Sequence, residues 1–194
     1  MTHVKYHTEA IVLESAPFQE ASKFLKLLTK DFGLIHASVR GVREVTSKLR
    51  YSLQDFSYAR IDLVTTKHGW KIVSALQIEN FCSVREDIKP EYVKMVTRIP
   101  QLLKRLVRGE EKNLLLFLTV RDGFMFLKER VLTSQEFKNF EAALVMKILH
   151  ALGYWGEHKE LSPFLKDALP LEHLLPRVEK RRPFVIREIN KALK

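Results

Sequence analysis

The chain has 194 residues, 46% of them hydrophobic, which is enough for a core in one large or two small domains. Its 33 Lys and Arg against 23 Asp and Glu give a net charge of +10, which favours a polyanionic partner, although simple solubility is the alternative. The single cysteine, Cys82, excludes an internal disulfide and a thiolate metal cluster. No apolar stretch approaches the roughly 20 residues of a membrane span. The N-terminus also lacks the apolar segment of a signal peptide, so we expect a cytoplasmic protein with no membrane association.

The first 80 residues carry short apolar runs typical of β-strands. Two of these runs flank Asp31-Phe32-Gly33, and two more flank His68-Gly69, so tight turns are expected at both places. The pattern predicts five strands, and five short strands in about 75 residues favour a small closed barrel. We therefore predict an N-terminal OB-fold that binds nucleic acid over residues 1–80.

After Asn80 the apolar residues recur with helical spacing. One helix is predicted to end at Gly109 and to kink or break at Pro100, and a second spans residues 113–127. A third is predicted to begin near Thr133 and to end at Gly153. The predicted fold class is thus α+β, with a five-stranded barrel followed by an all-α domain over residues 81–194.

The most informative segment is the basic stretch between the third and fourth predicted strands. Its cations are Arg40, Arg43, Lys48 and Arg50, with one acidic residue, Glu44, among them. Cations gathered in this way bind phosphate backbones by neutralising charge and releasing counterions. A solvated loop with no ligand is the alternative, and charge alone does not separate the two.

An aromatic ring next to a basic residue follows the turn at His68-Gly69. Trp70 and Lys71 combine a stacking surface with a charge, which is how OB-folds hold single strands. The alternative is that the indole ring packs into the core, as most aromatic rings do.

Basic residues also occur among the predicted helices. Lys104 and Arg108 are spaced to share one side of a helix, and Lys138 and Lys147 follow in the third helix. These four form a candidate site for an acidic peptide, and they carry our alternative hypothesis, a protein-interaction adaptor with little direct DNA binding. A second basic cluster, at residues 177–187, either extends a DNA-binding face or is a solvated terminal segment.

Sequence signatures of enzymes are absent. There is no phosphate-binding glycine-rich loop, and the seven His form no H-E-x-x-H or i,i+4 pair. We therefore expect no catalytic residues, no cofactor and no metal.

Several short motifs resemble the RecO family of recombination mediators. In the N-terminal part they are Ala10-Ile11-Val12-Leu13, Glu20, Leu27-Leu28-Thr29, Gly33, Arg40-Gly41, Ser47-Lys48-Leu49-Arg50, Leu53-Gln54 and Phe56. In the third predicted helix they are Phe140-Glu141-Ala142-Ala143-Leu144, Leu149 and Leu152-Gly153-Tyr154. The resemblance covers most of residues 8–156.

This resemblance implies an OB-fold protein that binds single- and double-stranded DNA and anneals complementary strands in DNA repair. It also implies three partners: the acidic C-terminal tail of single-strand-binding protein, a RecR-like protein, and RecA, which is loaded with their help. Many family members carry zinc-ligand cysteines after the Leu-Gly-Tyr motif, but here that segment has none, so zinc is not expected. The segment after Tyr154 is also reduced, which puts the partner-binding functions in more doubt than DNA binding.

Overall fold

The computed structural model describes residues 4–82, 90–155, 159–165 and 171–194. The chain forms two compact units, one of residues 1–88 with 96–117 and the other of residues 89–95 with 118–194. The last strand ends at Asn80. In addition, residues 96–117 pack with the strands in the first unit.

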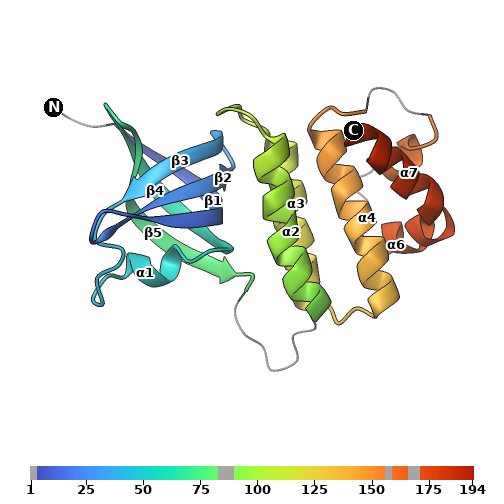
Figure 1. Cartoon of the computed structure of the whole chain (residues 1–194), viewed down its shortest axis with the longest axis horizontal. Coiled ribbons are helices and arrows are strands. Elements are labelled where there is room, and N and C mark those ends of the chain that lie inside the picture. The colour runs from blue at the N-terminus through green and yellow to red at the C-terminus, as the bar shows by residue number, and fades with distance from the viewer. Residues whose placement is uncertain (1–3, 83–89, 156–158, 166–170) are drawn as a thin grey trace. The chain divides into compact units, whose positions relative to one another are not determined.

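The first unit contains a five-stranded closed barrel. Its elements are β1 (Lys5–Phe18), β2 (Ser22–Thr29), β3 (Gly33–Val39), α1 (Leu49–Ser52), β4 (Ser57–Thr66) and β5 (Gly69–Asn80). The order around the barrel is β1-β2-β3-β5-β4, and β3 and β5 form a parallel pair while the other pairs are antiparallel (Figure 1). The short helix α1, between β3 and β4, lies against β5. This confirms the predicted α+β class and the five-stranded OB-fold.

Apolar side chains at every second position of the strands point inward and fill the barrel. Val12, Leu27, Ile35, Ala59 and Leu63 are almost completely buried and belong to one interior cluster. A register shift in β1 between Val12 and Glu14 inserts one residue, and such a bulge bends the strand so that the sheet can close.

The outer surface of β1, β2 and β3 has a covered and an open part. Ile11, Leu28 and Leu34 are neighbours across the three strands and point away from the interior, yet each is at most 5% exposed. Residues 96–117 contribute to this covering layer, since Phe117 packs against Tyr58 of β4 and Lys104 pairs with Glu14 of β1.

The remaining elements are helices. They are α2 (Pro90–Leu106), α3 (Leu114–Glu129), α4 (Ser134–Ala151), α5 (Ser162–Leu165), α6 (Leu171–Lys180) and α7 (Arg182–Ala192). A kink or a break was predicted at Pro100, and the break is wrong, because α2 runs through this residue without interruption. The predicted start of α4 is confirmed by a capping box, in which the side chains of Thr133 and Glu136 each accept a hydrogen bond from the other's backbone N–H. No helix among the described residues has the length and apolarity needed to cross a bilayer.

Candidate nucleic-acid interface

The basic segment after β3 is an ordered loop with two apolar anchors. Val42 and Leu53 are 2% and 1% exposed and belong to the interior cluster of the barrel. Directly before Val42 the chain turns at Gly41, whose φ of +67° suits glycine, and Glu44 N–H donates to the Gly41 carbonyl at 3.2 Å. With the apolar residues held inside, the charged ones are left on the surface.

All four predicted cations of this loop are exposed. Arg40 directly follows β3, Lys48 precedes α1 and Arg50 lies within it. Within the described ranges, none of the four cations forms an ion pair with another residue. We call Arg40, Arg43, Lys48 and Arg50 the basic loop, and its charges are available to a ligand.

The basic loop is also fastened to the turn between β1 and β2. The backbone N–H of Arg43 donates to the Ala21 carbonyl, and its guanidinium Nη1 donates to the Gln19 carbonyl, both at 3.4 Å. These bonds bring cations from residues 40–50 next to a hairpin about 20 residues earlier in the chain.

Beside the basic loop lies the uncovered part of the sheet surface. Lys26 and His36 face each other across β2 and β3, and Phe24 and Ser38 form the next such pair. Their strand neighbours Leu25, Leu27, Ile35 and Ala37 are interior, so these four side chains point outward. Phe18, near the end of β1, packs its ring on Phe24 from the same side. We call Phe18, Phe24, Lys26, His36 and Ser38 the open face.

The structure places Lys71 next to the open face. Lys71 is half-buried and lies opposite Ser38 in the parallel pairing of β5 with β3. Ser38 is two positions before Arg40 in the sequence. The outer surfaces of β2 and β3 are where OB-folds bind oligonucleotides. Lys71 and the basic loop therefore border the surface on which this fold class holds its ligand.

Trp70 is engaged within the protein. Its indole N–H donates to the Glu110 carboxylate at 2.9 Å, and its ring contacts Tyr6 and Phe32 with centroid separations of 5.4 and 5.1 Å. The ring is half-buried at the edge of the interior cluster. This geometry agrees with the packing alternative stated for Trp70 and leaves little of the ring for a base.

The open face was not identified from the sequence. The alternation of β2 did indicate it, because Phe24 and Lys26 point to the side of the strand opposite to Leu25 and Leu27. That alternation also places Leu28 outward, where it is buried, so alternation alone does not separate an exposed outer residue from a covered one.

The four cations proposed for an acidic peptide are divided between the two units. Lys104 is half-buried and pairs with Glu14 at 2.9 Å, whereas Arg108 is exposed. Because α2 ends at Leu106, Arg108 lies beyond the helix, and the expected i,i+4 placement of this pair is wrong.

Lys138 and Lys147 both lie on α4 of the second unit. They are nine residues apart, which is about 2.5 helical turns and puts them on opposite sides of the helix. Lys138 is exposed, while burial lowers the pKa of the half-buried Lys147 and the nearby carboxylate of Asp122 partly offsets this. The helix geometry does not favour a single peptide site that uses both.

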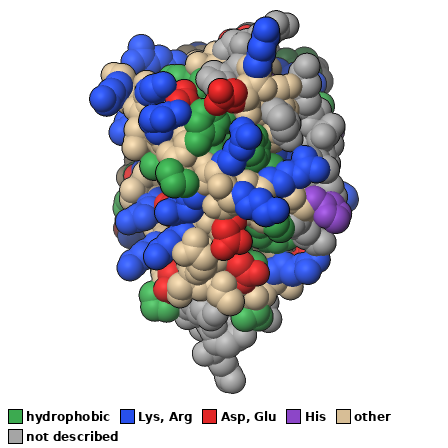
Figure 2. All heavy atoms as spheres, turned by 90° about the vertical axis from the view of Figure 1, so that its right-hand side faces the viewer, with side chains coloured by type: hydrophobic (Ala, Val, Ile, Leu, Met, Phe, Trp, Pro, Cys, Tyr) green, Lys and Arg blue, Asp and Glu red, His purple; other side chains and the backbone are tan. Residues whose placement is uncertain are grey.

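The second basic cluster lies on α6 and α7. Figure 2 shows Lys and Arg side chains spread over the face that it presents, with fewer Asp and Glu. The exposed cations of these helices and their junction include Arg177, Lys180, Arg181, Arg187 and Lys191. Arg187 and Lys191 both bond the buried carboxylate of Glu188, so part of this charge is neutralised within the protein.

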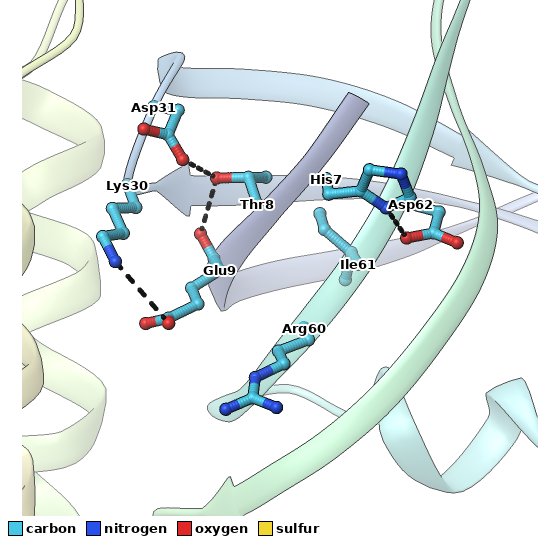
Figure 3. A pocket seen from close by; sticks show the side chains of 8 residues that line it. All are labelled: His7, Thr8, Glu9, Lys30, Asp31, Arg60, Ile61 and Asp62. Atoms are coloured by element: carbon cyan, nitrogen blue, oxygen red, sulfur yellow. Dashed lines mark hydrogen bonds and ion pairs between the residues drawn. The ribbon is translucent and has the colours of Figure 1, made fainter. Parts of the chain in front are cut away.

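A polar pocket of about 320 Å³ opens on the barrel between β1 and β4 (Figure 3). Its charged groups largely pair with one another, since His7 contacts Asp62 at 2.7 Å and Lys30 contacts Glu9 at 3.7 Å. Thr8 donates to Asp31 at 2.8 Å. Among the described residues, no group of three or more His, Cys, Asp or Glu side chains is placed to hold a metal ion.

The five-stranded closed barrel followed by helices places this chain in the OB-fold class. Residues 1–81 match the family model "Recombination protein O N terminal". The barrel of this chain is therefore similar to the N-terminal part of recombination protein O.

Curated relatives extend the similarity beyond the barrel. The DNA repair protein RecO of Thermodesulfovibrio yellowstonii is 27% identical over 155 residues, which cover 79% of this chain and 60% of the relative. That of Chlorobium phaeobacteroides is 27% identical over 165 residues, 80% of this chain and 61% of the relative. The protein of Heliobacterium modesticaldum is 32% identical over 83 residues, 43% of this chain and 30% of the relative. The matched parts thus span about 60% of the first two relatives' length, and less of the third.

Proposed function

We propose that this protein acts in DNA repair and recombination by binding single-stranded DNA on its barrel, across the open face and the basic loop. The observation that carries the proposal is the set of exposed cations, Arg40, Arg43, Lys48 and Arg50, held beside the outer surfaces of β2 and β3. Phosphates are bound by such unpaired cations. Lys71 adds a further charge at the same border.

In this proposal the protein also binds double-stranded DNA, anneals complementary strands and assists RecA loading. Annealing requires that two phosphate backbones be neutralised while the bases remain free to pair, and it needs no catalytic group. The proposed partners are a RecR-like protein and the acidic tail of single-strand-binding protein, in the cytoplasm of a bacterium. The match of residues 1–81 to the family model for the recombination protein O N-terminus, and the similarity to curated RecO proteins, support these roles.

The test is a salt titration of binding to a single-stranded oligonucleotide. The variant Arg43→Ala/Lys48→Ala/Arg50→Ala is expected to bind more weakly and to lower the slope of log K against log salt by about 2, because each lost contact removes about 0.7. Arg177→Ala/Lys180→Ala/Arg181→Ala is the matched control, since it removes three charges from the second unit. Equal losses in both variants would show that general charge, and not the basic loop, determines binding.

The adaptor hypothesis makes the opposite prediction. An adaptor would bind an acidic C-terminal peptide and would lack salt-dependent binding to single-stranded DNA. The pairing of Lys104 with Glu14, and the opposite placement of Lys138 and Lys147 on α4, argue against one peptide site made by all four cations. Side-by-side titrations with the peptide and with the oligonucleotide separate the two hypotheses.

A further inference from the structure

Two phenylalanine rings lie together on the surface of the first hairpin. Phe18 and Phe24 are each 38% exposed, and their ring centroids are 4.2 Å apart at an interplanar angle of 52°. Phe81, Phe117, Phe124 and Phe140, by contrast, are completely buried. Two adjoining exposed rings cost solvation free energy, and such patches commonly mark a binding surface.

The surroundings of the ring pair are cationic and polar. In the strand pairing, Phe24 lies opposite Ser38, which is two positions before Arg40, and it is two positions from Lys26 along β2. The Arg43 guanidinium bonds the carbonyl of Gln19, the residue after Phe18. Glu20 is the acidic residue of this turn, and the nearest acidic residue in the strand pairing, Glu14, is already paired with Lys104.

We propose that Phe18 and Phe24 form a stacking platform for unpaired bases, whose phosphates lie along Arg40, Arg43 and Lys26. This inference rests on the proposed function and identifies the single strand as the ligand of this site. An aromatic face with cations beside it matches a strand that presents bases and phosphates alternately. A protein partner fits less well, because two rings are far smaller than the roughly 800 Å² that a stable interface buries on each side.

The platform distinguishes single strands from duplexes. In a duplex both faces of each base are stacked on neighbouring base pairs, so the rings have no base to contact. A base stacked on the platform uses its flat face and leaves its Watson–Crick edge free. A strand held in this way is therefore displayed for pairing with a complementary strand.

The experiment compares Phe18→Ala/Phe24→Ala with wild type on three probes: a single-stranded oligonucleotide, an abasic oligonucleotide of equal length, and a duplex. We expect roughly tenfold weaker binding to the first, since base stacking on an aromatic ring is worth ~1–3 kcal/mol. Binding to the other two should change less than about twofold, as neither presents a stackable base. Leu76→Ala, which removes an exposed apolar side chain from β5, is the matched control and should leave all three affinities unchanged.

The variant Phe18→Leu/Phe24→Leu keeps apolar side chains but has no aromatic rings. It replaces the alanine variant in the experiment if that variant does not fold. It should show the same selective loss on the base-bearing single strand. Equal affinity of variant and wild type for that strand, with wild type still showing salt-dependent binding, would overturn the platform and leave the proposed function standing. Wild type that binds none of the probes would overturn both. Loss of self-association in the variant, with unchanged DNA affinity, would show instead that the rings contact a second copy.

Discussion

The indole N–H of Trp70 donates a 2.9 Å hydrogen bond to the carboxylate of Glu110. This bond joins the start of β5 to the segment that follows α2, within the same compact unit. The ring also makes an edge-to-face contact with Tyr6 and a tilted contact with Phe32. Trp70 thus connects three parts of the chain, and its role in folding is testable separately from DNA binding.

Trp70→Ala is expected to destabilise the first unit by about 3 kcal/mol, because it removes a large ring from the edge of the core. Trp70→Phe keeps an aromatic ring and loses the hydrogen bond, so it should cost about 1 kcal/mol. Denaturant unfolding followed by circular dichroism measures both. If Trp70 is structural, folded Trp70→Phe should bind single-stranded DNA as wild type does, and a selective loss of binding without loss of stability would contradict this assignment.

Gly33 is the position where substitution should be least tolerated in the β2–β3 turn. Its φ is +66°, and a Cβ built there would lie 2.1 Å from the backbone oxygen of Glu111. Gly33→Ala should therefore cost at least about 2 kcal/mol, since a left-handed residue is strained and a backbone atom must also move. Gly69→Ala is the control, because Gly69 also has positive φ but its Cβ would meet no atom within 4 Å. Similar unfolding free energies for the two variants would show that the approach of Glu111 is unimportant.

Much of the barrel could be predicted from the sequence, because period-two alternation and turn residues are local signals. The turns at Asp31-Phe32-Gly33 and His68-Gly69 are examples, and both connect neighbouring strands. The capping box at Thr133 is also local. Whether an outward-pointing residue is exposed or buried is not a local property. Leu28 and Phe24 both point outward from β2, and they differ only in whether another part of the chain covers them.

Residues 96–117, which are far from β2 in the sequence, contribute to this cover. The engaged ring of Trp70 depends on such a distant contact, with Glu110, whereas Phe18 and Phe24 lie on one hairpin and stay exposed. For this reason the sequence favoured Trp70 as the stacking residue, whereas the structure exposes two phenylalanines. The basic loop was found from the sequence because its four cations lie within one short segment, residues 40–50.

Asp31 provides a pH-dependent link within the first unit. The hydrogen bond from Thr8 is the main cause that lowers the pKa of the Asp31 carboxyl, Lys112 contributes at 3.0 Å, and partial burial opposes both. A lowered pKa in the folded state stabilises the protein above the pKa of the unfolded state, and this stabilisation is lost as pH falls through the folded value. Thr8→Val should therefore cost about 1 kcal/mol at neutral pH, and the difference from wild type should shrink below about pH 4.

Thermal or denaturant unfolding of wild type and Thr8→Val between pH 3 and pH 7 measures this effect. Asp31→Asn is the control, because its side chain does not ionise and its stability should lack this pH dependence. A difference between wild type and Thr8→Val that stays constant over the whole range would contradict the assignment of the pKa shift to this bond.

Arg43 has two roles that the choice of substitution separates. Its side chain carries a charge of the basic loop, and it also bonds the carbonyl of Gln19 in the β1–β2 turn. Arg43→Lys keeps the charge and loses the planar guanidinium that reaches this carbonyl, so single-strand affinity should fall modestly while the salt slope is retained. Arg43→Ala removes both and should also lower the slope by about 0.7. Lys48→Ala, which removes a charge that makes no bond to the hairpin, should lower the slope equally with a smaller loss of affinity. Equal affinities of Arg43→Ala and Lys48→Ala would show that the bond to Gln19 does not contribute, because the lost charge would then account for the whole effect.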